Sequence, residues 1–218
     1  VVLAPPVDTQ LFNLVCQKED FYVCAGRFVP FKRIDLVAEA FAAMPGKKLV
    51  LIGDGPEMEK IKSKAGPNCV FTGFLPPDEV YAYLSRARAF IFPSEEDFGI
   101  VPVEAQACGT PVIALGRGGA LETVVGWSSS LAHKKATGIF FDEQTAQSLV
   151  QAVNQFEAIE SDFIAENISQ HAQSFSIASF KGKFERVVNE ALADHASWQA
   201  PIADVSVRAD VNYFSNFE

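Results

Sequence analysis

Residues 89–115 constrain the fold of this chain more than any other stretch. The apolar run Ala89-Phe90-Ile91-Phe92 is long enough for a buried strand and too short for a helix. An acidic turn follows, and we expect a helix that begins at Gly99 and ends at Gly109, with a second strand at residues 112–115. A strand, loop, helix and strand in so few residues form a tight βαβ unit. Its loop therefore lies at the carboxyl edge of a parallel sheet, where open α/β folds bind ligands.

The same alternation of strands and helices extends over most of the chain. The pattern predicts further strands at residues 21–26, 48–53, 68–74 and 137–141, and helices at residues 34–44, 57–65, 76–87, 143–159, 161–171 and 178–192. Such alternation is typical of a doubly wound, Rossmann-like α/β fold with a parallel sheet of about six strands and helices on both faces.

Composition excludes several classes of function. The 218-residue chain has a formal net charge of −9, which argues against nucleic acid or an anionic membrane as a general partner. An anionic ligand would need a local basic pocket. The four cysteines lack the spacing of a metal site, so we expect reduced thiols, a cytoplasmic protein and no bound metal. The chain does not begin with Met, and we expect it to be part of a longer protein.

Two carboxylates and a helix N-terminus lie within the βαβ unit. Glu96 precedes the expected helix and Glu104 lies within it, and carboxylates accept directed hydrogen bonds from sugar hydroxyls. The N–H groups at the start of this helix, together with its dipole, are suited to binding a phosphate. These N–H groups belong to Phe98, Gly99, Ile100 and Val101.

Two other loops should lie at the same sheet edge. Gly26, Arg27 and Lys32 follow the first strand, and a guanidinium and an ammonium beside a glycine turn suit a diphosphate. A solvated basic loop is the alternative for an isolated Gly-Arg pair. Gly53 opens the turn after the second strand, where small residues let a ligand approach the backbone, although turn chemistry alone explains it equally well.

Together these motifs resemble the retaining GT-B glycosyltransferases of family 4. The residues that carry the resemblance are Glu-x7-Glu with Phe-Gly inside it, followed by Glu-Ala-x-Ala-x-Gly-x-Pro-Val-Ile-Ala at residues 104–114. The chain is similar to the nucleotide-sugar-binding C-terminal domain of mannosyltransferase-like members, which is one half of a GT-B fold. It departs from the family at Asp97, where many members have Gly.

The resemblance implies roles for individual residues. Arg27 and Lys32 would neutralise the diphosphate that leaves the donor, Glu96 would orient the donor sugar, and Glu104 would hold the ribose. Val70 matches a segment whose main chain meets the base. Gly118 and Gly119 match a glycine pair whose N–H groups reach the donor phosphate, and Glu122 either joins them or only caps its own helix.

The resemblance also implies an organisation into parts. Residues 1–20 would be an interdomain connecting segment, 21–175 the nucleotide-sugar-binding domain, 176–197 a helix toward a missing N-terminal domain, and 198–218 a tail of unknown order. The implied donor is GDP-mannose, with no metal, and the acceptor is a glycan or lipid-linked molecule of polysaccharide biosynthesis at the inner membrane face. We expect this chain alone to bind donor without transferring sugar, and its exposed interdomain surface to favour a dimer.

Other classes of function remain open. A GT-B-type nucleotide-sugar epimerase would share the sheet but would need acid/base carboxylates and histidine in the cleft. A non-catalytic nucleotide-sugar-binding module would keep the basic residues and would not need Glu96, so the presence of Glu96 favours the enzyme. A purely structural α/β domain would bind no nucleotide.

Overall fold

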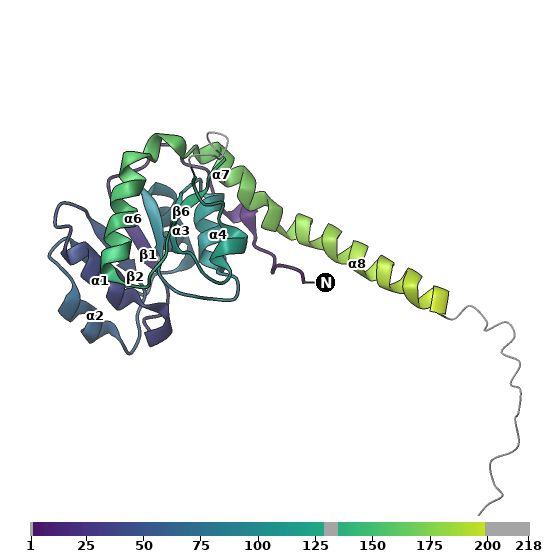
Figure 1. The fold of residues 1–218 in the computed structure, drawn as a ribbon, viewed down its shortest axis with the longest axis horizontal. Helices are drawn as coiled ribbons and strands as arrows, with labels where there is room; N and C mark the ends of the chain where they lie inside the picture. Colours follow the sequence, from purple (N-terminus) through teal and green to yellow (C-terminus); the bar gives the residue numbers. More distant parts are fainter. Residues whose placement is uncertain (1, 129–134, 199–218) are drawn as a thin grey trace, which may run out of the picture.

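The computed structural model describes residues 2–128 and 135–198, and its centre is one parallel sheet (Figure 1). The strand order is β3-β2-β1-β4-β5-β6, which confirms the predicted Rossmann-like α/β fold. Two predicted strands have the expected bounds, and the others are one or two residues shorter because their ends continue into turns. The strands are β1 (Tyr22–Ala25), β2 (Leu49–Ile52), β3 (Cys69–Gly73), β4 (Ala89–Phe92), β5 (Val112–Leu115) and β6 (Gly138–Phe141).

Helices cover both faces of the sheet, and alternation along the strands decides which residue faces which helix. Tyr22 and Cys24 of β1 pack in a cluster with α1 (Ile34–Ala42), α2 (Met58–Lys64) and α6 (Ala146–Ala158). Val23, between them, packs in a second cluster on the other face. The helices of that face are α3 (Pro77–Arg86), α4 (Ile100–Ala107), α5 (Ala120–Thr123) and α7 (Ala165–Ala172).

The chain reverses its direction across the sheet at β1. Helices α1 and α2 link β1, β2 and β3 outward along one face, and α3 then returns the chain to β4, which pairs with β1 on its other side. The loops after β1 and β4 consequently diverge from a common point at the carboxyl edge. Such a switch point is where a doubly wound sheet leaves a crevice for ligands.

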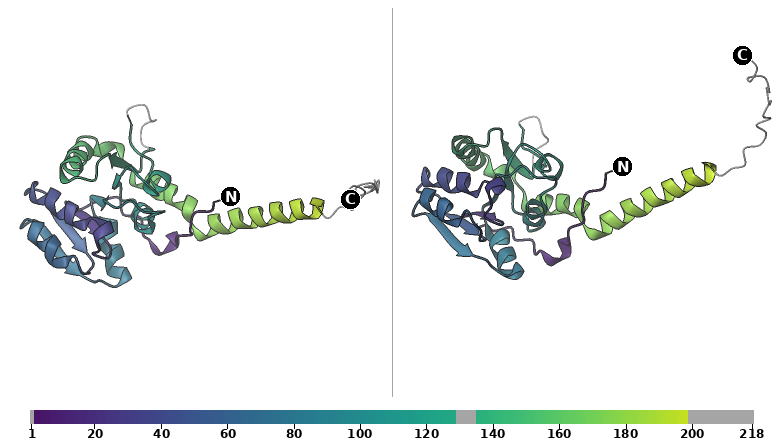
Figure 2. Two further views of the ribbon diagram at one scale, coloured as in Figure 1. Left: turned by 60° about the horizontal axis from the view of Figure 1, so that its bottom comes forward. Right: turned by 90° about the horizontal axis from the view of Figure 1, so that it is seen from below.

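The first residues of the described chain pack against the 3₁₀ turn η4 (Gln173–Phe175) and against α3. Val7 donates its N–H to Phe175 O at 2.9 Å, and Phe12 packs edge-on against Tyr81 of α3. The chain then continues into α8 (Ile177–Trp198), which projects away from the α/β body in every view (Figures 1 and 2). Apolar side chains of α8 are exposed, among them Phe184, Val188 and Leu192. That another domain or a second copy of the chain covers this helix stays a prediction.

The C-terminal helices differ from their predicted bounds. The helix expected at residues 143–159 begins at Ala146, because the Thr145 hydroxyl caps it by accepting from Ser148 N at 3.2 Å. The segment expected at residues 161–171 is a short 3₁₀ turn, η3 (Glu160–Asp162), followed by α7. The predicted tail lies outside the described residues beyond Trp198. None of the helices in the described ranges is long and apolar enough to cross a bilayer.

Close packing of the β1 and β2 loops makes Gly53 intolerant of a side chain. Its φ is +133°, and a Cβ there would lie 1.9 Å from Gly26 O. We expect Gly53→Ala to lower the free energy of unfolding by about 2 kcal/mol or more, measured by urea denaturation. Gly46→Ala is the matched control, since no atom lies within 4 Å of its Cβ position, and it should change stability little. Equal effects of the two substitutions would contradict this packing argument.

Asp35, at the start of α1, couples that helix to α2. Burial opposes ionisation, but Lys64, which donates to Asp35 Oδ2 at 3.1 Å, together with Lys60 and Arg33 holds the pKa of Asp35 below its usual value. The ionised Asp35 carboxylate therefore stabilises the fold above the unfolded-state pKa of about 4. This stabilisation is lost as pH falls through the folded-state pKa of Asp35.

We expect Asp35→Asn to lower stability at pH 7 by about 1 kcal/mol and to flatten the decline in stability below about pH 4. Urea denaturation at several pH values measures both effects. Glu59→Gln removes an exposed carboxylate from α2 and should leave the profile unchanged. An unaltered acid limb in Asp35→Asn would disprove the coupling.

Candidate functional site

The N-terminus of α4 opens into the switch-point crevice. Gly99 caps the helix with φ +82°, and a Cβ there would lie 2.9 Å from the Phe92 ring, so glycine is required at this position. The helix begins at Ile100 and ends at Ala107, within the predicted flanking glycines Gly99 and Gly109, and Gly109 has φ +74°. The first N–H groups of a helix have no partner within the helix. They are available to an anion in the crevice.

Lys32 and Glu96 meet across the switch point. Lys32 ends the 3₁₀ turn η2 (Pro30–Lys32) after β1, and its Nζ lies 2.6 Å from Oε1 of Glu96, in the loop after β4. The hydroxyl of Ser94 donates to the same oxygen at 2.5 Å. Of the three predicted catalytic residues Arg27, Lys32 and Glu96, the last two are thus in contact, although they are 64 positions apart in the sequence.

Gly118 and Gly119 support the Glu96 loop. A Cβ on Gly119 would lie 2.3 Å from Cα of Phe98, and one on Gly118 would lie 2.5 Å from Glu96 O. Gly119 N donates to Glu96 O at 2.7 Å. This N–H therefore holds the Glu96 backbone in the structure, and contact of the glycine pair with a donor phosphate stays a prediction. The two glycines are required because the loops pack backbone to backbone.

Three cavities lie in a row along the carboxyl edge and share lining residues. A small cavity of about 50 Å³ is bounded by Gly26, Lys32, Ser94, Glu96 and the start of α4. It shares Gly26 and Val101 with an apolar cavity of about 410 Å³. It shares Glu96 with a polar cavity of about 860 Å³ on the other side. The cleft is therefore a row of adjoining cavities, with the small one, lined by Lys32, between an apolar and a polar compartment.

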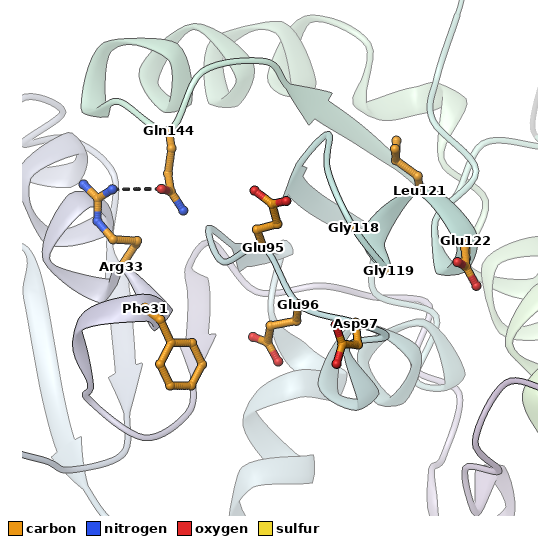
Figure 3. Close-up of a pocket in the computed structure, with 10 residues that line it drawn as sticks. All are labelled: Phe31, Arg33, Glu95, Glu96, Asp97, Gly118, Gly119, Leu121, Glu122 and Gln144. Carbon is orange, nitrogen blue, oxygen red and sulfur yellow. Dashed lines mark hydrogen bonds between the residues drawn. The ribbon is translucent and has the colours of Figure 1, made fainter.

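The polar cavity contains most of the carboxylates of the cleft (Figure 3). Figure 3 shows the acidic residues of the Glu96 loop between Arg33 and Gln144 on one side and Leu121 and Glu122 on the other. Arg33 has φ +52°, unusual for a non-glycine residue, and its Nη1 donates to Gln144 Oε1 at 2.9 Å. Such an arrangement offers hydrogen-bond acceptors to a ligand rich in hydroxyl groups. The lining residues are Phe31, Arg33, Glu95, Glu96, Asp97, Gly118, Gly119, Leu121, Glu122 and Gln144.

Arg27 borders the apolar cavity with an exposed side chain. Within the described residues its guanidinium has no ion-pair partner, so its charge is available to a ligand. Gly53, Phe74, Leu75 and Val80 also line this cavity. Phe74 is 82% exposed, so its ring forms an apolar surface at the rim.

Val70, whose main chain is predicted to meet the base, lies within β3. Val70 pairs with Val50 within the sheet, three residues before β3 ends at Gly73, and it does not line the apolar cavity. The cavity is formed instead by Phe74 and Leu75, directly after β3. Contact of the Val70 main chain with a base stays a prediction.

Glu104 lies one helical turn after Val101, which lines both the small and the apolar cavities. Burial raises the pKa of the Glu104 carboxyl. The pKa of Tyr81 is also raised, mainly by burial of its hydroxyl and, to a smaller extent, by the charge of Glu104. The two side chains are therefore near each other. Contact of Glu104 with a ribose stays a prediction.

Several residues of the cleft were not predicted from the sequence. Among them are Ser94, Phe31, Arg33 and Gln144, which carry no motif. For Phe31, the available signal is that this large aromatic residue directly precedes the predicted Lys32 in the chain. The Arg33–Gln144 contact joins segments 111 positions apart and leaves no local signal.

Comparison with curated proteins finds relatives whose names describe sugar transfer. Over 148 residues the chain is 34% identical to the GDP-mannose-dependent alpha-(1-6)-phosphatidylinositol monomannoside mannosyltransferase of Mycobacterium tuberculosis, covering 60% of this chain and 36% of the relative. Over 203 residues it is 28% identical to the D-inositol 3-phosphate glycosyltransferase of Mycobacteroides abscessus, covering 88% of this chain and 44% of the relative. The chain thus spans less than half the length of each.

A solved structure supports the same assignment. The sucrose-phosphate synthase of Thermosynechococcus elongatus superposes with a TM-score of 0.72 and 25% identity, over 87% of this chain and 52% of the other. The family description "Glycosyl transferases group 1" matches residues 9–175, which include every predicted site residue. The chain therefore belongs to the glycosyl transferases group 1 family.

Proposed function

We propose that the cleft binds a nucleoside-diphosphate sugar and that the protein transfers the sugar to an acceptor with retained anomeric configuration. The order of the three cavities carries the proposal. An apolar compartment, a small basic centre and a polar compartment follow one another, as do the base, the diphosphate and the sugar of such a donor. Family membership supports the proposal, because two relatives are named as glycosyltransferases.

In this proposal the basic centre stabilises the leaving group. Arg27, Lys32 and the N–H groups at the start of α4 surround the position of the diphosphate. They oppose the negative charge that develops when the bond between sugar and diphosphate breaks. These groups do the work that a metal ion does in other transferases, so we expect no metal to be required.

Glu96 and Phe31 provide the sugar side of the cleft. The Glu96 carboxylate accepts hydrogen bonds from sugar hydroxyls and orients the donor, without acting as a nucleophile. Phe31 is 62% exposed at the polar cavity and offers an apolar surface to a sugar ring. The leading donor is GDP-mannose. It is supported by the similarity of residues 96–109 to the motif of mannosyltransferase-like members and by the donor in the name of the Mycobacterium tuberculosis relative.

In this proposal the acceptor binds outside the donor cleft. We propose a glycan or a lipid-linked molecule, bound at the cytoplasmic membrane face with the help of a further domain. The names of the two relatives, which refer to a phosphatidylinositol mannoside and to an inositol phosphate, are compatible with a polyol acceptor.

Calorimetric titration of the chain with GDP-mannose, GDP, UDP-glucose and UDP tests the proposed donor. We expect GDP-mannose to bind most tightly, with the same affinity when EDTA is present. A preference for UDP-glucose would replace the proposed sugar and base while keeping the donor site. Absence of binding by all four ligands would contradict the proposed function.

Removing the Arg27 guanidinium should weaken the binding of every nucleoside diphosphate. Arg27→Ala is expected to cost about 1.5–3 kcal/mol, which is roughly a tenfold to hundredfold loss of affinity, as for a charged hydrogen bond. Arg86→Ala is the control, because Arg86 is an exposed arginine at the end of α3 that pairs with Glu19. An equal loss in both variants would show a general charge effect rather than a diphosphate contact.

A further inference from the structure

The two carboxylate oxygens of Glu96 have different surroundings. Oε1 accepts from the Ser94 hydroxyl at 2.5 Å and from Lys32 Nζ at 2.6 Å. Within the described ranges, Oε2 accepts no hydrogen bond. Figure 3 shows the carboxylate pointing into the polar cavity on the side of Phe31. One oxygen is therefore held by the protein, and the other is available to a ligand.

Ser94 is more deeply buried than Lys32. Its residue is 1% exposed, and it follows the buried strand β4 after Pro93. Pro93 O accepts from Gln144 Nε2 at 2.9 Å, which fixes the backbone just before Ser94. A buried hydroxyl requires a partner, and the described partner of this hydroxyl is Glu96 Oε1.

The Lys32 side chain has a competing role. Its ammonium lies on a long flexible stem and lines the small cavity where the proposed diphosphate binds. A diphosphate carries more negative charge than a carboxylate and draws this ammonium away from Glu96. Once that happens, Ser94 is the remaining described side chain that holds Oε1.

We propose that Ser94 is a positioning residue that holds Glu96 Oε1, so that Oε2 meets the sugar hydroxyls of the donor while Lys32 binds the diphosphate. This inference rests on the proposed function, and it adds a residue that acts only on the sugar. Its consequence is selective: loss of the Ser94 hydroxyl weakens the binding of a nucleotide sugar and leaves the bare nucleoside diphosphate unaffected.

The test compares two ligands on matched variants by calorimetric titration. We expect Ser94→Ala to lower the affinity for GDP-mannose about tenfold and to leave the affinity for GDP within twofold. If wild type prefers the uridine nucleotides, UDP-glucose and UDP replace this pair. Ser94→Cys keeps the volume but donates weakly and should resemble Ser94→Ala, whereas Ser94→Thr keeps the hydroxyl and should recover most of the sugar-dependent affinity.

Two further measurements separate positioning from a general structural effect. Ser169→Ala is the control, because this part-buried serine donates one hydrogen bond to Ala107 O on α4, and it should change neither affinity. In a Glu96→Ala background, Ser94→Ala should have no further effect, since its role acts through Glu96.

The outcomes distinguish this inference from the proposed function. If wild type binds none of GDP-mannose, GDP, UDP-glucose and UDP, the proposed function fails and this inference fails with it. If wild type binds both, an equal loss of the two affinities in Ser94→Ala, or no loss, overturns the inference alone. A Ser94→Ala effect that persists without Glu96 overturns it as well.

Discussion

The parallel pairing of β1 with β4 is the contact on which the cleft depends. The paired residues are Tyr22 with Ala89 and Val23 with Phe90, so the registered pairing ends two residues before each strand does. Beyond that point the strands separate, and their last residues line the small cavity together with Gly26 and the start of α4. The same divergence brings Lys32 and Glu96 to opposite walls of one opening. A sheet with β1 at an edge would place these residues too far apart to share a ligand.

An overall negative charge does not prevent this cleft from binding an anion. The formal charge of −9 is spread over the whole chain, and salt screens exposed charges beyond about 8–10 Å. Local groups decide instead. Arg27 and Lys32 lie at the apolar and central compartments, whereas the carboxylates of Glu95, Asp97 and Glu122 lie at the polar one. The division is partial, because Arg33 also lines the polar cavity and Asp54 the apolar one, but Arg27 and Lys32 line other cavities than these three carboxylates.

The sequence predicted the layers of the fold because its patterns are local. The apolar runs at β4 and β5, and the glycines that flank α4, depend only on neighbouring residues. The cleft was predicted in part, since motifs placed Lys32, Glu96 and the α4 N-terminus at one sheet edge. The rest depends on tertiary contacts without a local signal. Arg33 adopts a left-handed conformation and bonds to Gln144, and Gly119 uses its N–H on the Glu96 backbone. The apolar cavity lies at Phe74 rather than at Val70 because β3 ends at Gly73.

The Lys32–Glu96 ion pair explains how two opposite charges remain compatible with an unliganded cleft. Their side chains are only 24% and 20% exposed, so either charge alone would lose much of its hydration. In the unliganded protein each compensates the other. Under the proposed function, a diphosphate would give Lys32 a new anionic partner and leave Glu96 with the Ser94 hydroxyl and a carboxylate oxygen that needs donors. The hydroxyls of an attached sugar are such donors. Occupation of the basic centre therefore creates, at Glu96, the hydrogen-bonding demand that a sugar meets and that a bare nucleotide does not.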